Sequence, residues 1–135
     1  MAYLLDTNTI SEWRKPVPNP GVVTWLQSAR RETFYISVLS VGEVRRGIER
    51  LRSRDPLQAE SIDTWWTELV ATFPTRTIGV DSEIADLWGR MDAVHQIPHV
   101  DGLLAATALV RGWTLVTRNV GDVARTGVTV LNPFS

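Results

Sequence analysis

The run Tyr3-Leu4-Leu5-Asp6 constrains the fold more than any other stretch of the chain, because two adjacent leucines lead directly into an acid. Apolar residues that do not alternate with polar ones are typical of a strand covered on both faces, as at the centre of a parallel sheet. Ligands of open α/β sheets bind beyond the carboxyl ends of such strands. Asp6 is therefore a candidate site residue, although Asp also favours the position that caps a following helix.

The rest of the chain alternates short apolar segments with amphipathic ones. Further strands are expected at residues 34–38, 76–80, 113–117 and 128–131. Thr9–Glu12 and Ser40–Glu43 have the spacing of a capping box and predict two helix starts. The alternation predicts an α/β fold with one domain over residues 1–135: a three-layer α/β/α sandwich around a mostly parallel five-stranded sheet.

Further residues predict where single elements begin and end. Asp81 is expected to cap one helix, and the helix before it is expected to end near Pro74. A helix that opens at Pro98 is apolar nearly all round, so we expect it to be deeply buried, and Gly112 should end it. Arg118–Asp122 is expected to form a loop after the fourth strand.

Composition narrows the class of protein. With 44% hydrophobic and 21% charged residues, the chain is typical of a soluble globular protein. It has no cysteine, which excludes disulfides, thiolate metal sites and a Cys nucleophile. His95 and His99 match no ligand spacing and are expected at the surface. No charged and apolar leader precedes Tyr3, and no apolar run approaches the roughly 18 residues of a membrane span, so the expected location is the cytoplasm without membrane contact.

Four acids occur at equivalent points of this pattern. Asp6 ends the first strand, Glu43 follows the second, Asp101 begins the buried helix, and Asp122 follows the fourth strand. In a doubly wound sheet these points gather at one edge, although each acid alone also fits a cap, a helix dipole or a turn. Clustered carboxylates without Cys or His suit Mg²⁺ or Mn²⁺, ions that activate water and stabilise displacement at phosphorus.

The motifs around these acids resemble those of PIN-domain ribonucleases, specifically VapC-type toxins of toxin–antitoxin pairs. Four motifs, in order and over the whole chain, carry the resemblance: Leu4–Glu12, Ser40–Ile48, Asp101–Ala108 and Val116–Asp122. The resemblance implies metal-dependent cleavage of RNA phosphodiester bonds. It assigns Mg²⁺ or Mn²⁺, and catalysis, to Asp6, Glu43, Asp101 and Asp122, with Asn8, Thr117 and Asn119 as supporting polar groups.

Two positions depart from the family pattern. Val123 stands where many relatives have Phe, which affects local packing. Asn119 stands where some PIN domains have a further acid, so a second metal site is expected to be weak.

The resemblance also implies partners. These are an RNA substrate, a cognate antitoxin whose C-terminal segment blocks the acid cleft, and assembly as a homodimer or a toxin–antitoxin hetero-oligomer. The net charge of −1 gives no general attraction to nucleic acid, but thirteen of the fourteen basic residues are Arg, which suits bidentate contacts to phosphate. Arg46, Arg50 and Arg54 share one helix face and are candidates for RNA binding; the alternative is a solvated face.

Two other functions fit parts of the pattern. An aspartyl phosphoacceptor domain would use Asp6 as the phosphorylated group, but such sites need a Lys after a later strand, and Lys15 is the only one here. A PIN-fold module that binds RNA or protein with weak or no catalysis is the second alternative. The presence of all four acids favours catalysis over that module.

Overall fold

The computed structural model describes residues 1–73 and 75–135, which contain a five-stranded sheet of order β3-β2-β1-β4-β5. Every pair of neighbouring strands is parallel. The strands are β1 (Tyr3–Leu5), β2 (Phe34–Ser37), β3 (Thr77–Ile78), β4 (Thr114–Val116) and β5 (Val130–Leu131). The predicted α/β class and parallel sheet are confirmed, and the strands are shorter than the segments we expected.

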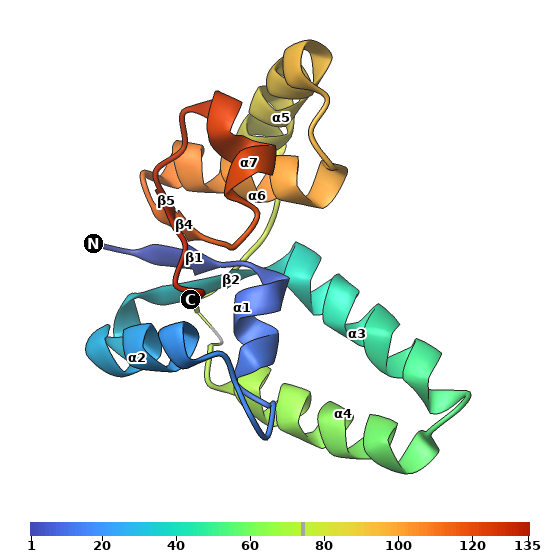
Figure 1. Cartoon of the computed structure of the whole chain (residues 1–135). Coiled ribbons are helices and arrows are strands. Elements are labelled where there is room, and N and C mark those ends of the chain that lie inside the picture. The colour runs from blue at the N-terminus through green and yellow to red at the C-terminus, as the bar shows by residue number, and fades with distance from the viewer. Residues whose placement is uncertain (74) are drawn as a thin grey trace.

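Helices cover both faces of the sheet. They are α1 (Thr7–Glu12), α2 (Pro20–Ser28), α3 (Val38–Arg52), α4 (Pro56–Ala71), α5 (Ser82–His95), α6 (His99–Arg111) and α7 (Val120–Val123), with short 3-10 helices at Arg31–Thr33 and Ala124–Thr126. Helices α1 to α4 lie on one side of the sheet and α5 to α7 on the other (Figure 1). The predicted sandwich of three layers is therefore confirmed. None of the described helices has the length and apolar character needed to cross a bilayer.

The two leucines of β1 each face a different core. Leu4 belongs to the cluster formed with α6, where it packs with Leu104, and Leu5 belongs to the cluster formed with α1 and α4, where it packs with Ile10 and Trp66. Both leucines have no exposed surface. Burying each of them contributes roughly 1.5–3 kcal/mol to folding, so β1 anchors both layers.

Two helix starts differ from the capping boxes in the sequence. The side chain of Asp6 caps α1 and that of Ser37 caps α3, so Thr9 and Ser40 lie inside their helices instead of starting them. Each strand leads into its helix without a loop, so the cap is the residue after β1 in one case and the last residue of β2 in the other. The predicted caps at Asp81 and Gly112 are confirmed, whereas Pro74 lies outside the described residues.

The strand order reverses next to β1. The chain runs from β1 to β2 and β3 on one side, whereas β4 and β5 lie on the other side of β1. Crossovers that leave in opposite directions open a crevice beyond the carboxyl ends of the two strands at the reversal. The residues that follow β1 and β4 are therefore placed to form a binding site.

Candidate active site

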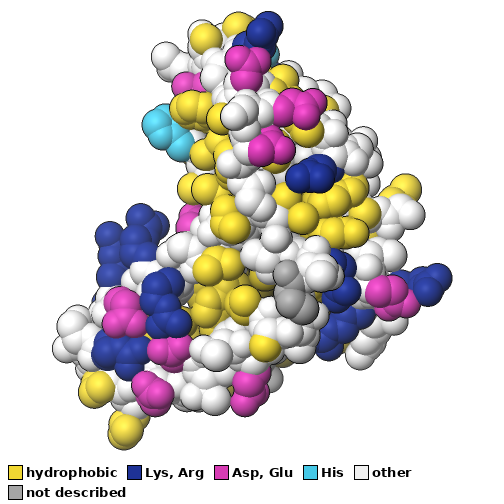
Figure 2. Space-filling model, turned by 180° about the vertical axis from the view of Figure 1, so that it is seen from behind, with side chains coloured by type: hydrophobic (Ala, Val, Ile, Leu, Met, Phe, Trp, Pro, Cys, Tyr) yellow, Lys and Arg dark blue, Asp and Glu magenta, His cyan; other side chains and the backbone are white. Residues whose placement is uncertain are grey.

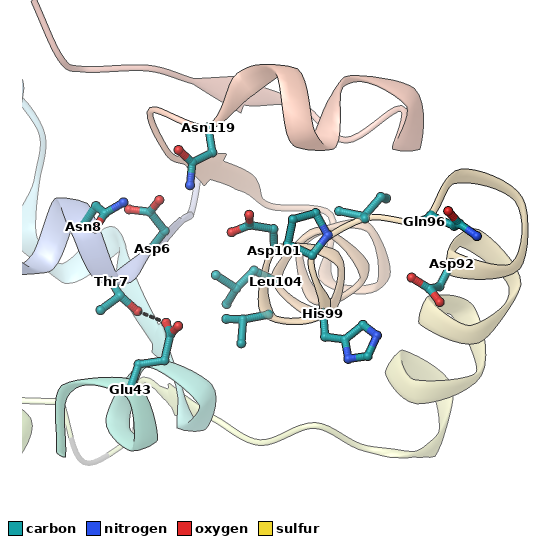
Figure 3. Close-up of a pocket in the computed structure, with 13 residues that line it drawn as sticks. Asp6, Thr7, Asn8, Glu43, Asp92, Gln96, His99, Asp101, Leu104 and Asn119 are labelled. Carbon is teal, nitrogen blue, oxygen red and sulfur yellow. Dashed lines mark hydrogen bonds between the residues drawn. The ribbon is translucent and has the colours of Figure 1, made fainter. Parts of the chain in front are cut away.

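A cleft of about 900 Å³ opens beyond the carboxyl ends of β1 and β4. Of the predicted site residues, Asp6, Asn8, Glu43, Asp101 and Asn119 line this cleft (Figure 3). They come from four separate parts of the chain, so the fold brings together what the sequence keeps far apart. We call this cavity the acid cleft.

Asp6 serves both as a helix cap and as a wall of the acid cleft. Its Oδ1 accepts a hydrogen bond from the backbone N–H of Thr9 at 2.8 Å, and its own N–H donates to the Val116 carbonyl at 3.0 Å. The side chain is 3% exposed. These bonds fix the carboxylate between β1 and β4, and its other oxygen remains for a ligand.

Glu43 reaches the acid cleft from α3 on the same side as Asp6. Helix α3 begins at Val38, so Glu43 lies in its second turn, one turn later than the sequence suggested. The hydroxyl of Thr7 donates a hydrogen bond to Glu43 Oε1 (Figure 3). It also lies 3.1 Å from the hydroxyl oxygen of Ser40. Thr7 therefore ties the first turn of α1 to α3.

Asp101 lies opposite these residues, in the first turn of α6. Burial raises the pKa of its carboxyl, and the charges of Asp122, Asp6 and Glu43 raise it further. The side chain of Asn119 acts in the other direction through a hydrogen bond. Asp122, Asp6 and Glu43 are thus all close enough to Asp101 to repel its charge.

Asp122 and Thr117 support the acid cleft without lining it. Asp122 lies in α7, where we expected a loop, so that expectation was wrong. Of the three neighbouring acids, Asp122 contributes most to the raised pKa of Asp101. Thr117 is buried, and its hydroxyl accepts a hydrogen bond from the backbone N–H of Asn119 at 3.0 Å. This turn directs the Asn119 side chain into the cleft (Figure 3).

Several cleft residues escaped the sequence analysis. They include Thr7, Asp92, Gln96, His99 and Leu104. His99 is exposed, as expected of a surface residue, but it also borders the cleft, with its ring edge-on to Trp88 at 5.5 Å between centroids. The sequence could have indicated that His99 borders the cleft, because it lies two residues before Asp101 in the same helical turn. Asp92 and Gln96, at the end of α5, had no such indication.

The donor groups suit a hard divalent cation, since the side chains around the acid cleft offer carboxylate and amide oxygens and their charges repel one another. Their spacing is wider than a closed ligand shell. Within residues 1–73 and 75–135, no three Asp, Glu or His side chains converge on one point as metal ligands do. The chemistry of the site fits Mg²⁺ or Mn²⁺, and binding would require at least one side chain to rotate inward.

The sequence matches the PIN domain family over residues 3–127, and the chain belongs to that family. It is 32% identical over 138 residues to toxin FitB of Neisseria gonorrhoeae, covering 97% of each chain. It is 28% identical over 138 residues to a VapC ribonuclease of Sinorhizobium fredii, covering 97% of this chain and 96% of the relative. The crystal structure of FitAcB from Neisseria gonorrhoeae superposes with a TM-score of 0.89 at 31% identity over 97% of each chain. The resemblance stated from the motifs is confirmed.

Proposed function

We propose that this protein is a metal-dependent endoribonuclease that acts as the toxin of a toxin–antitoxin pair. The observation that carries the proposal is that Asp6, Glu43 and Asp101, from three separate parts of the chain, line the cleft where the strand order reverses, with Asp122 near Asp101. The relatives named as a toxin and as a VapC ribonuclease support the same activity.

An RNA phosphate could not approach four carboxylates unless positive charge intervened. A bound Mg²⁺ or Mn²⁺ would supply that charge and make water a nucleophile at neutral pH. Asp6, Glu43 and Asp101 would hold the ion from the cleft walls, and Asp122 would add negative charge beside Asp101. Asn8 and Asn119 offer amide N–H groups that can donate to phosphate oxygens.

The same residues set the expected products. In the described part of the chain, His99 is the one histidine that lines the acid cleft, so no pair of imidazoles is placed to cyclise the ribose 2′-hydroxyl. We therefore propose that water attacks phosphorus in line and that cleavage leaves a 5′-phosphate and a 3′-hydroxyl.

The phosphoacceptor alternative loses support in the structure. Lys15 forms an ion pair with Glu12, a residue that lines the groove between α1 and α2 and not the acid cleft. No lysine of the described chain lines the acid cleft. A phosphorylated Asp6 would have carboxylates around it and no cationic side chain to neutralise the phosphoryl group.

We also propose a cognate antitoxin as the physiological partner. An Arg or Lys from its C-terminal segment would pair with the carboxylates of the acid cleft and block access for RNA. Co-expression with the protein encoded by a neighbouring open reading frame should yield a complex and suppress toxicity. Absence of any copurifying partner would contradict this assignment.

The activity is tested by incubating total RNA with the protein in EDTA and in Mn²⁺, followed by mapping of new 5′ ends. We expect Mn²⁺-dependent cuts with 5′-phosphate ends, and no cuts with Asp101→Asn. Products that end in 2′,3′-cyclic phosphate would overturn the proposed chemistry. Equal cleavage by Asp101→Asn would remove the acid cleft from the reaction.

A further inference from the structure

A second groove leads into the acid cleft. It measures about 360 Å³ and lies between α1, α3 and α4, and it joins the cleft because Thr7 and Glu43 line both cavities. We call it the arginine groove. Its lining residues are Thr7, Ser11, Arg14, Glu43, Val44, Gly47, Ile48, Leu51, Arg54, Gln58 and Ile62.

The arginine groove carries positive charge that the acid cleft lacks. Arg14 and Arg54 both line it, and within the described residues neither side chain has an ion pair or a hydrogen bond to an acid. No Arg or Lys lines the acid cleft in the same part of the chain. An anionic chain that crosses the cleft would therefore find cationic side chains in the adjoining groove and none in the lining of the cleft.

Two arginines of α3, Arg45 and Arg52, are paired with acids. Arg45 donates to both oxygens of Asp63 at 2.9 Å, and Arg52 donates to Glu49, Glu60 and Asp63. Seen from behind, acidic and basic side chains intermingle over α3 and α4 (Figure 2). Arg14 and Arg54 therefore differ from Arg45 and Arg52 in having no acidic partner among the described residues, and they differ from Arg46 and Arg50 in lining a groove.

The floor of the arginine groove is apolar and has one open position. Val44, Leu51 and Ile62 are partly exposed there, and a ribose or a base can pack against their side chains. A Cβ at Gly47 would meet no atom within 4 Å, so the backbone of α3 is accessible there. A ligand can approach the helix at Gly47 more closely than at any residue with a side chain.

We propose that the arginine groove binds the single strand of RNA next to the scissile phosphodiester, with Arg14 and Arg54 on flanking phosphates. The inference rests on the proposed ribonuclease function and extends it to a substrate subsite. Arg side chains bind phosphate through paired N–H donors, and such contacts fix the register of a strand without reading its sequence. Of the three arginines predicted to bind RNA, only Arg54 lines the groove; Arg46 and Arg50 line neither cavity.

Two glycines of α3 provide a matched test. Gly42 and Gly47 both have open space at Cβ, but only Gly47 lines the arginine groove. Gly47→Leu and Gly42→Leu should both keep or raise the melting temperature, since Leu favours helix more than Gly does. We expect Gly47→Leu to raise Kd for a short single-stranded RNA about tenfold, in proportion to the blocked subsite. Gly42→Leu should bind like the wild type.

The charge of the groove is tested with the same RNA in Mn²⁺, in the Asp101→Asn background, which is expected not to cleave it. Arg14→Gln and Arg54→Gln should each weaken binding and reduce the slope of log K against log salt by about one unit. Arg90→Gln is the control, because Arg90 is an exposed residue of α5 that pairs with Asp86. Unchanged affinity and slope in both groove variants would overturn the inference.

The same variants distinguish RNA binding in the groove from antitoxin binding there, and they distinguish this inference from the proposed nuclease function. If they bind RNA normally but lose a copurifying antitoxin, the groove is a protein interface and the inference is wrong. If they weaken RNA binding while the wild type cuts no RNA with Mn²⁺, the groove stands as a binding site and the proposed nuclease function fails. Failure of the wild type to bind any RNA would overturn both.

Discussion

The two walls of the acid cleft are built differently. On the wall of α1 and α3, each carboxylate has a donor in the fold itself: Asp6 accepts from the Thr9 N–H, and Glu43 accepts from the Thr7 hydroxyl. On the wall of α6, Asp101 has its pKa raised by burial and by three acids, and Asn119 alone opposes the shift. The carboxylates on the wall of α1 and α3 are held by hydrogen bonds that form when the protein folds. The carboxylate of Asp101, on the wall of α6, is repelled by neighbouring acids, and a bound cation would relieve that repulsion.

This difference separates structural from chemical roles among residues of one type. Asp6 contributes to stability because it caps α1, and an Asn would preserve that contribution. Asp101 costs stability when it is charged, and an Asn would remove the cost. Both acids are expected to be essential for cleavage, so loss of activity cannot distinguish the two walls. The free energy of unfolding of the Asn variants can distinguish them.

The largest expected effect is on activity and is the same for both walls. Asp6→Asn and Asp101→Asn should each reduce RNA cleavage by about a hundredfold or more, the usual loss when an electrostatic group of an active site is removed. The measurement is the initial rate of cleavage of a mapped RNA in Mn²⁺. Retention of activity in either variant would take that carboxylate out of the site.

A second prediction concerns the pH dependence of stability. The pKa of Asp101 is raised above its ordinary value of 3.8, so the folded protein binds this proton more tightly than the unfolded chain does. The resulting loss of stability is complete above the raised pKa and disappears below 3.8. Asp101→Asn should therefore raise the free energy of unfolding at pH 7, and the gain should shrink as pH falls toward 4. Urea unfolding in EDTA at both pH values checks this, and Asp6→Asn should show no comparable gain.

The smallest expected effect on cleavage comes from the hydrogen bond between Thr7 and Glu43, on the wall of α1 and α3. Thr7→Val removes the hydroxyl that donates to Glu43 and should cost about 1 kcal/mol of stability, the usual value of one hydrogen bond. Cleavage should fall about tenfold because Glu43 loses its fixed orientation, a change equivalent to about 1.4 kcal/mol. Thr7→Ser keeps the hydroxyl and should restore most of the rate. Equal losses in both variants would show that the methyl group matters and not the hydrogen bond.

The sequence was sufficient to predict the parallel sheet and the placement of Asp6 and Asp101 near one another at its edge. Leu4 and Leu5 predict a central strand because neither face of β1 can be polar, and the alternation of elements then places Asp6 and Asp101 at one edge. The cap of α1 at Asp6 was one of the roles expected of that residue, whereas the cap of α3 at Ser37 was missed because β2 joins α3 without a loop.

The arginine groove could not be predicted from local pattern. Arg14 follows α1 and Arg54 follows α3, and only the packing of α1, α3 and α4 brings them to one cavity. Sequence spacing grouped Arg54 with Arg46 and Arg50 on one helix face, but α3 ends at Arg52, before Arg54. Whether an arginine is already paired, as Arg45 is with Asp63, depends on a neighbouring helix that spacing does not reveal.

The central claim is that the carboxylates of the acid cleft, Asp6, Glu43 and Asp101, form one cation site, and thermal melting with increasing Mn²⁺ tests it most directly. Because a cation held by this site binds only the folded protein, the melting temperature of the wild type should rise with Mn²⁺ concentration. Asp101→Asn should melt higher than the wild type in EDTA and gain less from Mn²⁺. Asp81→Asn should behave as the wild type, since Asn caps α5 about as well as Asp. The account is contradicted if Mn²⁺ leaves the wild type unmoved and Asp101→Asn melts lower in EDTA.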